Sequence, residues 1–578
     1  MHEQPHGDNT LAQYLAQALP GYGVTHVFEL VGGMITVLLD ALHQNPALRV
    51  ISMHHEQGAG FAAEGFARMA RAPSVALATS GPGATNLLTA IGSCYFDSVP
   101  AVFITGQVNT FEMRKEGLGR QGGFQETDIV SMATPVTKWA TVVESATDFG
   151  EVLDRAFSIA TGDRPGPVLI DIPMNVQRER VTPYLMPPAV ATPTPADLSP
   201  FIEALDAGLA QSSRPLALIG GGVRIAGATD KLLRALEEWQ VPAVVSLMGL
   251  DAVPCDNAWR VGFLGSYGNR WANWAVSQAD LLLVLGSRLD IRQTGSDIAG
   301  FVGDRRMFHV DVDASELNSH VVGATIACAD AEVFLSEALA RIAQGRPRSQ
   351  WLADIRHHRQ QWPHDAENVP ADGINPNHAI VQISEAIGDA AAFVTDVGQH
   401  QMWAAQSVYL RQGQRFLTSG GMGSMGFGLP AAIGAALAAP GRTVCLIAGD
   451  GGFQCNIQEL QTAVRLQLPL RIVILDNGAH GMVRQFQQSY LGQRYHSTVW
   501  GYSAPDFAAV ADSYGIASWT AGTHDDLHTA LSLAEEVSGP SLIRVVIEQG
   551  LNAYPKMAFG QPFGSMEPNV APLEMEGT

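Results

Sequence analysis

The sequence predicts an α/β fold built from three doubly wound parallel-sheet domains in tandem. Apolar, strand-like runs alternate with segments of helical periodicity, and this alternation occurs in three blocks separated by proline-rich or polar stretches. The chain has 578 residues, which exceeds the size at which a single hydrophobic core stops growing. Open parallel sheets bind ligands at the carboxyl ends of their strands, so candidate sites are sought there.

The first block, residues 1–180, contains four predicted strands: Val24–Leu30, Ser74–Thr79, Ala101–Thr105 and Val168–Ile172. Residues 181–200 follow, and their prolines at 183, 187, 188, 193, 195 and 200 are too dense for a core element. A linker and a domain boundary are therefore predicted there.

The second block, residues 201–345, has predicted strands at Leu216–Ile219, Ala243–Leu247, Leu281–Leu285 and Met307–Val312. A polar crossover linker, 346–376, leads to the third block, 377–552, with predicted strands at Ala392–Thr395, Val444–Ala448, Arg471–Leu475 and Leu542–Ile547. The alternation then stops, so the tail, 553–578, is expected either to fold over a site or to stay mobile.

Charge and composition exclude several classes of partner. The formal net charge is −21, from 56 acidic and 35 basic residues, without a long run of either sign, which argues against nucleic acid or an anionic membrane. The five cysteines are scattered and lack metal-type spacing, as expected of free thiols in a reducing cytoplasm. The N-terminus lacks the pattern of a signal peptide, and no apolar run approaches about 18 residues. A cytoplasmic protein is expected.

The most informative motif is Gly449-Asp450-Gly451, with Asn477 placed 27 residues after Asp450. Both polar side chains follow predicted strands, and carboxylate and amide oxygens are ligands that Mg²⁺ accepts together with phosphate oxygens. Gly451 and Gly452 leave backbone N–H groups free to approach a diphosphate. The motif predicts a Mg²⁺–diphosphate site. The alternative is a strand-to-helix turn capped by aspartate, which Gly-Asp-Gly alone favours.

Glu56 lies where a predicted strand gives way to the small-residue helix Gly58–Ala70. In isolation it is most simply a charge stabilising a helix N-terminus. Its combination with the turn Ser80–Asn86 and with the diphosphate site indicates thiamine diphosphate, whose aminopyrimidine ring needs a carboxylate partner. The cofactor carries out the chemistry, and the protein binds and orients it and supplies the electrostatic environment.

The second block offers a further nucleotide site. Gly220-Gly221-Gly222 follows one strand, 286–292 follows another, and 309–313 ends a third. Glycines there admit a pyrophosphate and acidic residues bind ribose, as in dinucleotide folds. The alternative is a Rossmann-like domain that binds nothing.

Seven segments, in the same order, carry a family resemblance: 54–69, 80–86, 123–130, 164–173, 396–406, 418–436 and 449–460. Along almost its full length the chain resembles the catalytic subunit of acetohydroxyacid (acetolactate) synthases and their thiamine-diphosphate relatives. The three domains would then be pyrimidine-binding, FAD-binding-like and diphosphate-binding.

The resemblance implies that Glu56 contacts the pyrimidine and that Mg²⁺ is held by Asp450, Asn477 and the carbonyl of Ala479. The cofactor would be bound by Gly398, Gln399, His400, Gly423, Met425, Gly449, Asp450, Gly451, Gly452 and Asn477. In this family Glu56 and the metal site come from different subunits. The resemblance thus implies a homodimer or homotetramer with active sites at the interface, and it leaves room for a separate regulatory subunit.

A structural FAD is also implied by the resemblance, although Tyr267 stands where a histidine is expected. Its site would comprise Gly220, Gly221, Gly222, Gly286, Arg288, Asp290, Arg292, Asp311, Asp313 and Asp330.

The implied activity is that of a carbon–carbon lyase or transferase of branched-chain amino acid biosynthesis. It decarboxylates a 2-oxo acid such as pyruvate and joins the resulting enamine to a second 2-oxo acid. Gln125 would hydrogen-bond developing oxyanions and Gly33 would approach the reacting carbon. The substrate pocket would be lined by Phe124, Arg292, Met482, Val483 and Phe486. Arg292 is the candidate for the acceptor carboxylate.

Three departures concern the substrate. Met174 stands where the family usually has lysine, Phe486 stands where it has tryptophan, and Val31 replaces a proline. Alternatives therefore remain: a specialised carboligase that transfers the acetyl unit of pyruvate to another aldehyde or ketone, such as a keto-sugar, or a simple 2-oxo acid decarboxylase. A catalytically silent homologue is a further alternative. The presence of Glu56, Asp450 and Asn477 argues against it.

Overall fold

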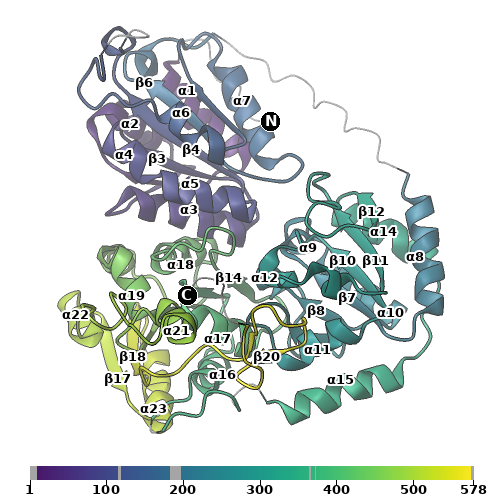
Figure 1. Ribbon diagram of the computed structural model, residues 1–578. Helices are drawn as coiled ribbons and strands as arrows, with labels where there is room; N and C mark the ends of the chain where they lie inside the picture. Colours follow the sequence, from purple (N-terminus) through teal and green to yellow (C-terminus); the bar gives the residue numbers. More distant parts are fainter. Residues whose placement is uncertain (1–8, 115–118, 183–196, 364–365, 372, 574–578) are drawn as a thin grey trace.

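Three six-stranded sheets, all parallel, form the framework of the chain (Figure 1). The computed structural model describes residues 9–114, 119–182, 197–363, 366–371 and 373–573. The predicted α/β class with three doubly wound sheets is confirmed. The predicted linker falls mostly on residues 183–196, which lie outside the described residues.

The first sheet has the strand order β2-β1-β3-β4-β6-β5. Its strands are β1 (His26–Leu30), β2 (Arg49–Ser52), β3 (Ser74–Ala78), β4 (Ala101–Gln107), β5 (Trp139–Val142) and β6 (Val168–Pro173). The α-helices of this domain are α1 (Leu11–Ala18), α2 (Thr36–Gln44), α3 (Glu56–Ala70), α4 (Pro82–Asn86), α5 (Leu88–Asp97), α6 (Ile129–Ala133) and α7 (Phe149–Thr161).

The central sheet has the order β12-β11-β10-β7-β8-β9. Its strands are β7 (Pro215–Ile219), β8 (Ala243–Val245), β9 (Arg260–Phe263), β10 (Leu281–Leu285), β11 (Arg306–Asp311) and β12 (Thr325–Cys328). The surrounding helices are α8 (Ser199–Gln211), α9 (Gly221–Ile225), α10 (Thr229–Trp239), α11 (Arg270–Gln278), α12 (Ile291–Thr294), α13 (Ile298–Val302), α14 (Ala331–Arg341) and α15 (Ser349–Gln361).

The third sheet has the order β14-β13-β15-β16-β18-β17. Its strands are β13 (Ala392–Thr395), β14 (Arg415–Leu417), β15 (Val444–Gly449), β16 (Leu470–Asp476), β17 (Ala517–Ala521) and β18 (Ser541–Val546). The helices are α16 (Pro376–Ala386), α17 (Gln399–Ser407), α18 (Gly428–Ala438), α19 (Asp450–Phe453), the 3₁₀ helix η7 (Gln454–Glu459), α20 (Leu460–Arg465), α21 (Gly481–Tyr490), α22 (Phe507–Ser513) and α23 (His524–Glu535).

The first and third domains share one topology. Numbered within its own domain, each sheet has the order 2-1-3-4-6-5, and α3 and α18 each connect the second strand to the third. These two equivalent helices pack against each other (Figure 1). Phe61 and Phe427 meet edge to face with ring centroids 5.5 Å apart. A Cβ atom on Gly65 would lie 2.2 Å from the carbonyl oxygen of Ala431, so only glycine permits this approach.

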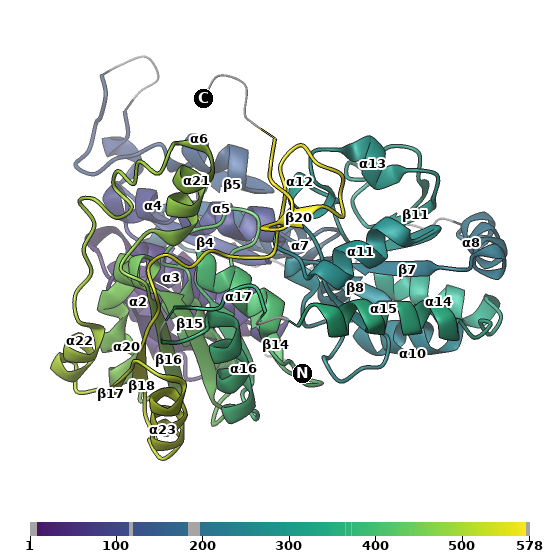
Figure 2. The same ribbon diagram turned by 60° about the horizontal axis from the view of Figure 1, so that its bottom comes forward.

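The crossover and the tail both contain regular secondary structure. The polar crossover contains helix α15, whose Trp351 and Ile355 are buried against the central domain. The tail crosses to the central domain, where β19 (Lys556–Met557) pairs with β20 (Met566–Glu567) and the amide of Met557 donates to the carbonyl of Ser266 (Figure 2). Of the two outcomes expected for the tail, the described part, 553–573, is folded.

All five cysteines are free thiols, as expected. Within the described ranges, no helix has both the length and the apolar character needed to cross a membrane.

Candidate active site

Asp450 stands where β15 ends and α19 begins, with its side chain buried. Oδ2 of the carboxylate accepts a hydrogen bond from the hydroxyl group of Tyr502 across 2.8 Å. Burial raises the pKa of Asp450 to about 6, although the bond from Tyr502 acts in the opposite direction. Tyr502 was not predicted, because it lies in an irregular segment without a motif.

Asn477 follows the neighbouring strand β16, which pairs in register with β15. Its Oδ1 accepts from the amide of Ala479 at 3.1 Å, and its Nδ2 donates to Oε1 of Gln399 at 3.0 Å. No cluster of three or more histidine, cysteine or acidic side chains suited to a metal occurs among the described residues. One carboxylate and one amide are nevertheless the sparse oxygen set that suits Mg²⁺, which keeps waters and phosphate oxygens as its other ligands.

His400, in the first turn of α17, lies beside the end of β15. A Cβ atom on Gly449 would lie 2.7 Å from its Nδ1, so the imidazole packs directly on the glycine motif. Burial lowers the pKa of His400 to about 3, and its buried Nε2 has no hydrogen-bond partner. An unpartnered buried polar atom is costly unless a ligand satisfies it. This orphan fits a diphosphate bound beside Gly449 and Gly451.

The turn that holds Gly423 and Met425 lies beside the same sheet. Gly423 has φ +66° and Gly426 has φ +85°, values that favour glycine. Asp396, at the end of β13, accepts from the amides of Gly426 and Gly428 and thereby fixes the start of α18. Burial raises the pKa of Asp396 to about 6. No role was predicted for Asp396, although its place directly after a predicted strand could have indicated one.

A second cluster surrounds Glu56 in the first domain. Its buried carboxylate accepts from Nδ2 of Asn86 at 2.9 Å, and Oε1 lies beside Gly83. Gln125 adopts a φ of +66° and packs on Gly81 of the same turn. Asn86 lies in the quoted motif 80–86, but the sequence alone gave it no role.

Gly33 begins a short 3₁₀ helix, Gly33–Ile35, in the same region. The next residue, Met34, donates from its amide to the hydroxyl of Thr79 at the end of β3. Glu56, Gln125 and Gly33 are thus brought to one end of the first sheet.

Within one chain, hydrogen bonds link residues that neighbour the two clusters. Nδ2 of Asn456 donates to Oε1 of Gln57 at 3.1 Å, and the amide of His54 donates to Oε1 of Glu459 at 2.9 Å. No hydrogen bond or ion pair connects Glu56 to Asp450 or Asn477 in the part of the chain that the structure describes.

The predicted pocket wall is largely exposed. The exposed fractions are 81% for Phe124, 37% for Met425, 54% for Val483 and 46% for Phe486, and Val31 beside Gly33 is 63% exposed. Met482, on α21 with Val483 and Phe486, is half-buried. Val483 and Phe486 lie on one helix, and contiguous exposed apolar side chains can mark a surface that a ligand or another chain covers.

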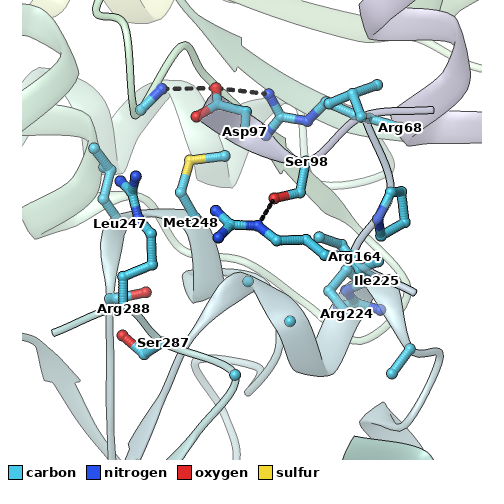
Figure 3. A pocket seen from close by; sticks show the side chains of 18 of the residues that line it. Arg68, Asp97, Ser98, Arg164, Arg224, Ile225, Leu247, Met248, Ser287 and Arg288 are labelled. Carbon is cyan, nitrogen blue, oxygen red and sulfur yellow. Dashed lines mark hydrogen bonds and ion pairs between the residues drawn. The ribbon is translucent and has the colours of Figure 1, made fainter. Parts of the chain in front are cut away.

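A cavity of about 390 Å³ is lined mainly by the central domain, with Arg68, Asp97 and Arg164 of the first domain and Gly420 of the third also in its wall (Figure 3). Of the predicted flavin residues, the cavity is lined by Gly221, Gly222, Gly286, Arg288, Asp290, Arg292, Asp311 and Asp330. Gly220 is not part of the lining, and Asp313 instead pairs with Arg164 at 3.1 Å. Glycines, cations and carboxylates around one cavity fit a dinucleotide. Arg164, Met248 and Met402 also line it and were not predicted as ligands.

Comparison with protein families gives the class of protein. Residues 9–132 match the N-terminal TPP binding domain of thiamine pyrophosphate enzymes, 202–338 match the central domain, and 396–545 match the C-terminal TPP binding domain. The chain belongs to the thiamine pyrophosphate enzyme family, with all three of its domains in order.

Particular relatives are acetolactate synthase large subunits. The chain is 38% identical to the one from Parasynechococcus marenigrum (strain WH8102), over 96% of this chain and 90% of the relative. It is 37% identical to acetolactate synthase isozyme 2 large subunit of Escherichia coli (strain K12), over 94% of this chain and 96% of the relative. The large subunit of Pyropia yezoensis is 35% identical over 97% and 95% of the two chains. The resemblance stated from the motifs is confirmed.

Proposed function

We propose that this enzyme uses thiamine diphosphate to decarboxylate pyruvate and to join the remaining two-carbon unit to a second 2-oxo acid, as an acetolactate synthase does. The observation that carries the proposal is the buried Nε2 of His400, which has no hydrogen-bond partner and belongs to an imidazole packed on the Gly449–Gly452 motif. A diphosphate bound at these strand ends would accept a hydrogen bond from this atom. Similarity to acetolactate synthase large subunits along almost the whole chain supports it.

We also propose Mg²⁺ and FAD as further cofactors. Asp450, Asn477 and the carbonyl of Ala479 would hold Mg²⁺. The glycines and the charged side chains of the central cavity would hold FAD in a structural role, because the proposed reaction has no net redox step. When bound, thiamine diphosphate supplies the electron sink for decarboxylation.

The chain's own groups then have separate tasks. Glu56 would hold a proton at the pyrimidine edge, and its bond from Asn86 orients the carboxylate for this. Gln125 would donate its amide to an oxyanion, and its left-handed backbone fixes the direction of that side chain. Arg292 makes no ion pair through its side chain among the described residues, so its guanidinium is free to bind an acceptor carboxylate.

The proposed active unit is a homodimer, or a homotetramer built from it, with each site shared between two chains. The exposure of Val31, Phe124, Val483 and Phe486 supports this. A second copy of the chain would cover these apolar side chains and close the pocket.

Product analysis tests the function. Purified protein with Mg²⁺, thiamine diphosphate and FAD is given pyruvate, alone and with a panel of aldehyde and ketone acceptors, and the products are identified by mass spectrometry. Acetolactate from pyruvate alone is expected. Acetaldehyde as the main product would indicate a decarboxylase, and turnover only with an added acceptor would indicate the specialised carboligase. Protein that binds no thiamine diphosphate would contradict all three.

A further inference from the structure

One carboxylate of the first domain lies between the two proposed cofactor sites. Asp97 is the last residue of α5, and its side chain is 1% exposed. Its Oδ1 accepts from the amide of Gly421 at 2.7 Å and its Oδ2 accepts from the amide of Gly420 at 3.0 Å. The same carboxylate faces Nη1 of Arg68 at 3.9 Å (Figure 3).

Gly420 and Gly421 begin the turn that presents Gly423 and Met425 to the proposed thiamine diphosphate site. Residues 421–423 and Met425 are exposed, so few contacts define this turn. Besides Asp97, contacts from α5, α3 and α17 hold its first part; from α17, Nε2 of Gln401 donates to the hydroxyl of Thr418 at 2.7 Å. Ser93 pairs with Ser419 at 3.3 Å, and Nη1 of Arg68 donates to the carbonyl of Thr418 at 2.7 Å.

The residues that make the contact between Asp97 and the turn also form part of the wall of the central cavity. Asp97, Arg68 and Gly420 all line the cavity, together with Met248. A Cβ atom on Gly420 would lie 2.3 Å from the sulfur of Met248, so the turn packs directly on the central domain at this point. A ligand seated in the cavity would therefore lie against the residues that hold the turn.

The groups around Asp97 act on its charge in opposite directions. Burial raises the pKa of Asp97, while Arg68 and the two backbone N–H groups favour its charged form. A buried carboxylate that accepts two N–H groups is stabilised by charge-assisted hydrogen bonds, which are about twice as strong as neutral ones. Removing the charge would leave the amides of Gly420 and Gly421 competing for one neutral oxygen.

We propose that Asp97 is a positioning residue that fixes the Thr418–Met425 turn for thiamine diphosphate and transmits occupancy of the central cavity to that turn. The inference rests on the proposed function, because both ligands come from it. Asp97 touches neither reacting atoms nor the metal site. It acts by holding Gly420 and Gly421, and through them Met425.

The test measures thiamine diphosphate binding by calorimetry with Mg²⁺, on flavin-saturated and flavin-depleted protein. For Asp97→Asn we expect affinity for thiamine diphosphate to fall about tenfold, the scale of one lost charged hydrogen bond, while turnover at saturating cofactor falls much less. In the wild-type protein, flavin should tighten thiamine diphosphate binding, and this coupling should vanish in Asp97→Asn.

Glu29→Gln is the matched control. Glu29 is also a buried carboxylate of the first domain, but it is bonded to Ser52 and makes no contact with the turn. Glu29→Gln should lower thermal stability without changing the affinity for thiamine diphosphate, measured with or without flavin. Ser93→Ala tests the same turn if Asp97→Asn does not fold, and about two- to threefold weaker cofactor binding is expected from the loss of a neutral hydrogen bond.

Unchanged cofactor affinity in Asp97→Asn, or an equal flavin effect in the variant and the wild type, overturns the proposal. So does unchanged affinity in Ser93→Ala together with no flavin effect in the wild type. Failure of the proposed function is a separate result, because wild-type protein would then bind no thiamine diphosphate at all.

Discussion

The hydroxyl group of Tyr502 donates a hydrogen bond to Oδ2 of Asp450 across 2.8 Å, from a segment 52 residues further along the chain. This bond offsets part of the desolvation that raises the pKa of the carboxylate to about 6. The proposed metal ligand therefore depends on a distant tyrosine for its charge.

Tyr502→Phe should raise the pKa of Asp450 further, by about one unit if one hydrogen bond to a charged group is lost. Mg²⁺ binds the carboxylate form, so metal-dependent binding of thiamine diphosphate is lost as the pH falls through this pKa. In the variant the loss should occur at a higher pH. Calorimetric titrations at a series of pH values check this, with Tyr514→Phe, at the C-terminal cap of α22, as control. Identical pH profiles for Tyr502→Phe and the wild type would contradict it.

Asp450→Ala should abolish Mg²⁺-dependent binding of thiamine diphosphate, because it removes the charged member of a sparse ligand set. Asp506→Asn, at the exposed N-cap of α22, controls for loss of a carboxylate in the same domain. Calorimetry with and without Mg²⁺ measures the effect. Equal affinity in Asp450→Ala and the control would refute the metal role.

Glu56→Gln should keep cofactor binding but reduce turnover about 10²- to 10⁴-fold, the usual contribution of a positioned acid–base group. Glutamine keeps an oxygen that can accept from Asn86, so the fold around it should survive. Steady-state rates at saturating cofactor, beside calorimetric affinities, separate the two effects. Full activity would exclude Glu56 as the pyrimidine partner.

Arg292→Lys should weaken binding of the acceptor 2-oxo acid more than binding of the donor pyruvate, because lysine offers a point charge in place of a planar fork. We expect the KM for the acceptor 2-oxo acid to rise about tenfold while release of carbon dioxide from pyruvate in single-turnover experiments stays close to wild type. A change confined to the donor step would assign Arg292 elsewhere, for example to the flavin cavity that it also lines.

The strands that sequence patterns predicted are the interior strands of the three sheets, and the six that they missed are the edges. β3 is buried along its whole length, as an apolar run predicts, whereas β12 is mostly exposed, β17 is partly exposed, and both carry polar residues. The edge strands β2, β5, β12 and β17 are partly or mostly exposed, because one side of the backbone has no neighbouring strand, whereas β9 and β14 are mostly buried but short. An apolar-run criterion misses strands that are this short or this exposed.

Candidate site residues show a similar limit. Asp450, Asn477, Glu56 and the central glycines follow strands and carry local motifs, so chain position alone could place them. Tyr502 and Asp97 act through contacts between elements distant in sequence, and no local pattern marks such contacts. The loss of Asp313 from the cavity lining has the same origin, since its partner Arg164 comes from the first domain.

The packing of α3 on α18 pairs two like domains within one chain. Two folding units with one strand order meet through corresponding helices, which is how the halves of a symmetric dimer meet. A substitution in this contact would therefore disturb both units at once, because any side chain larger than hydrogen at Gly65 would have to push α18 away from α3.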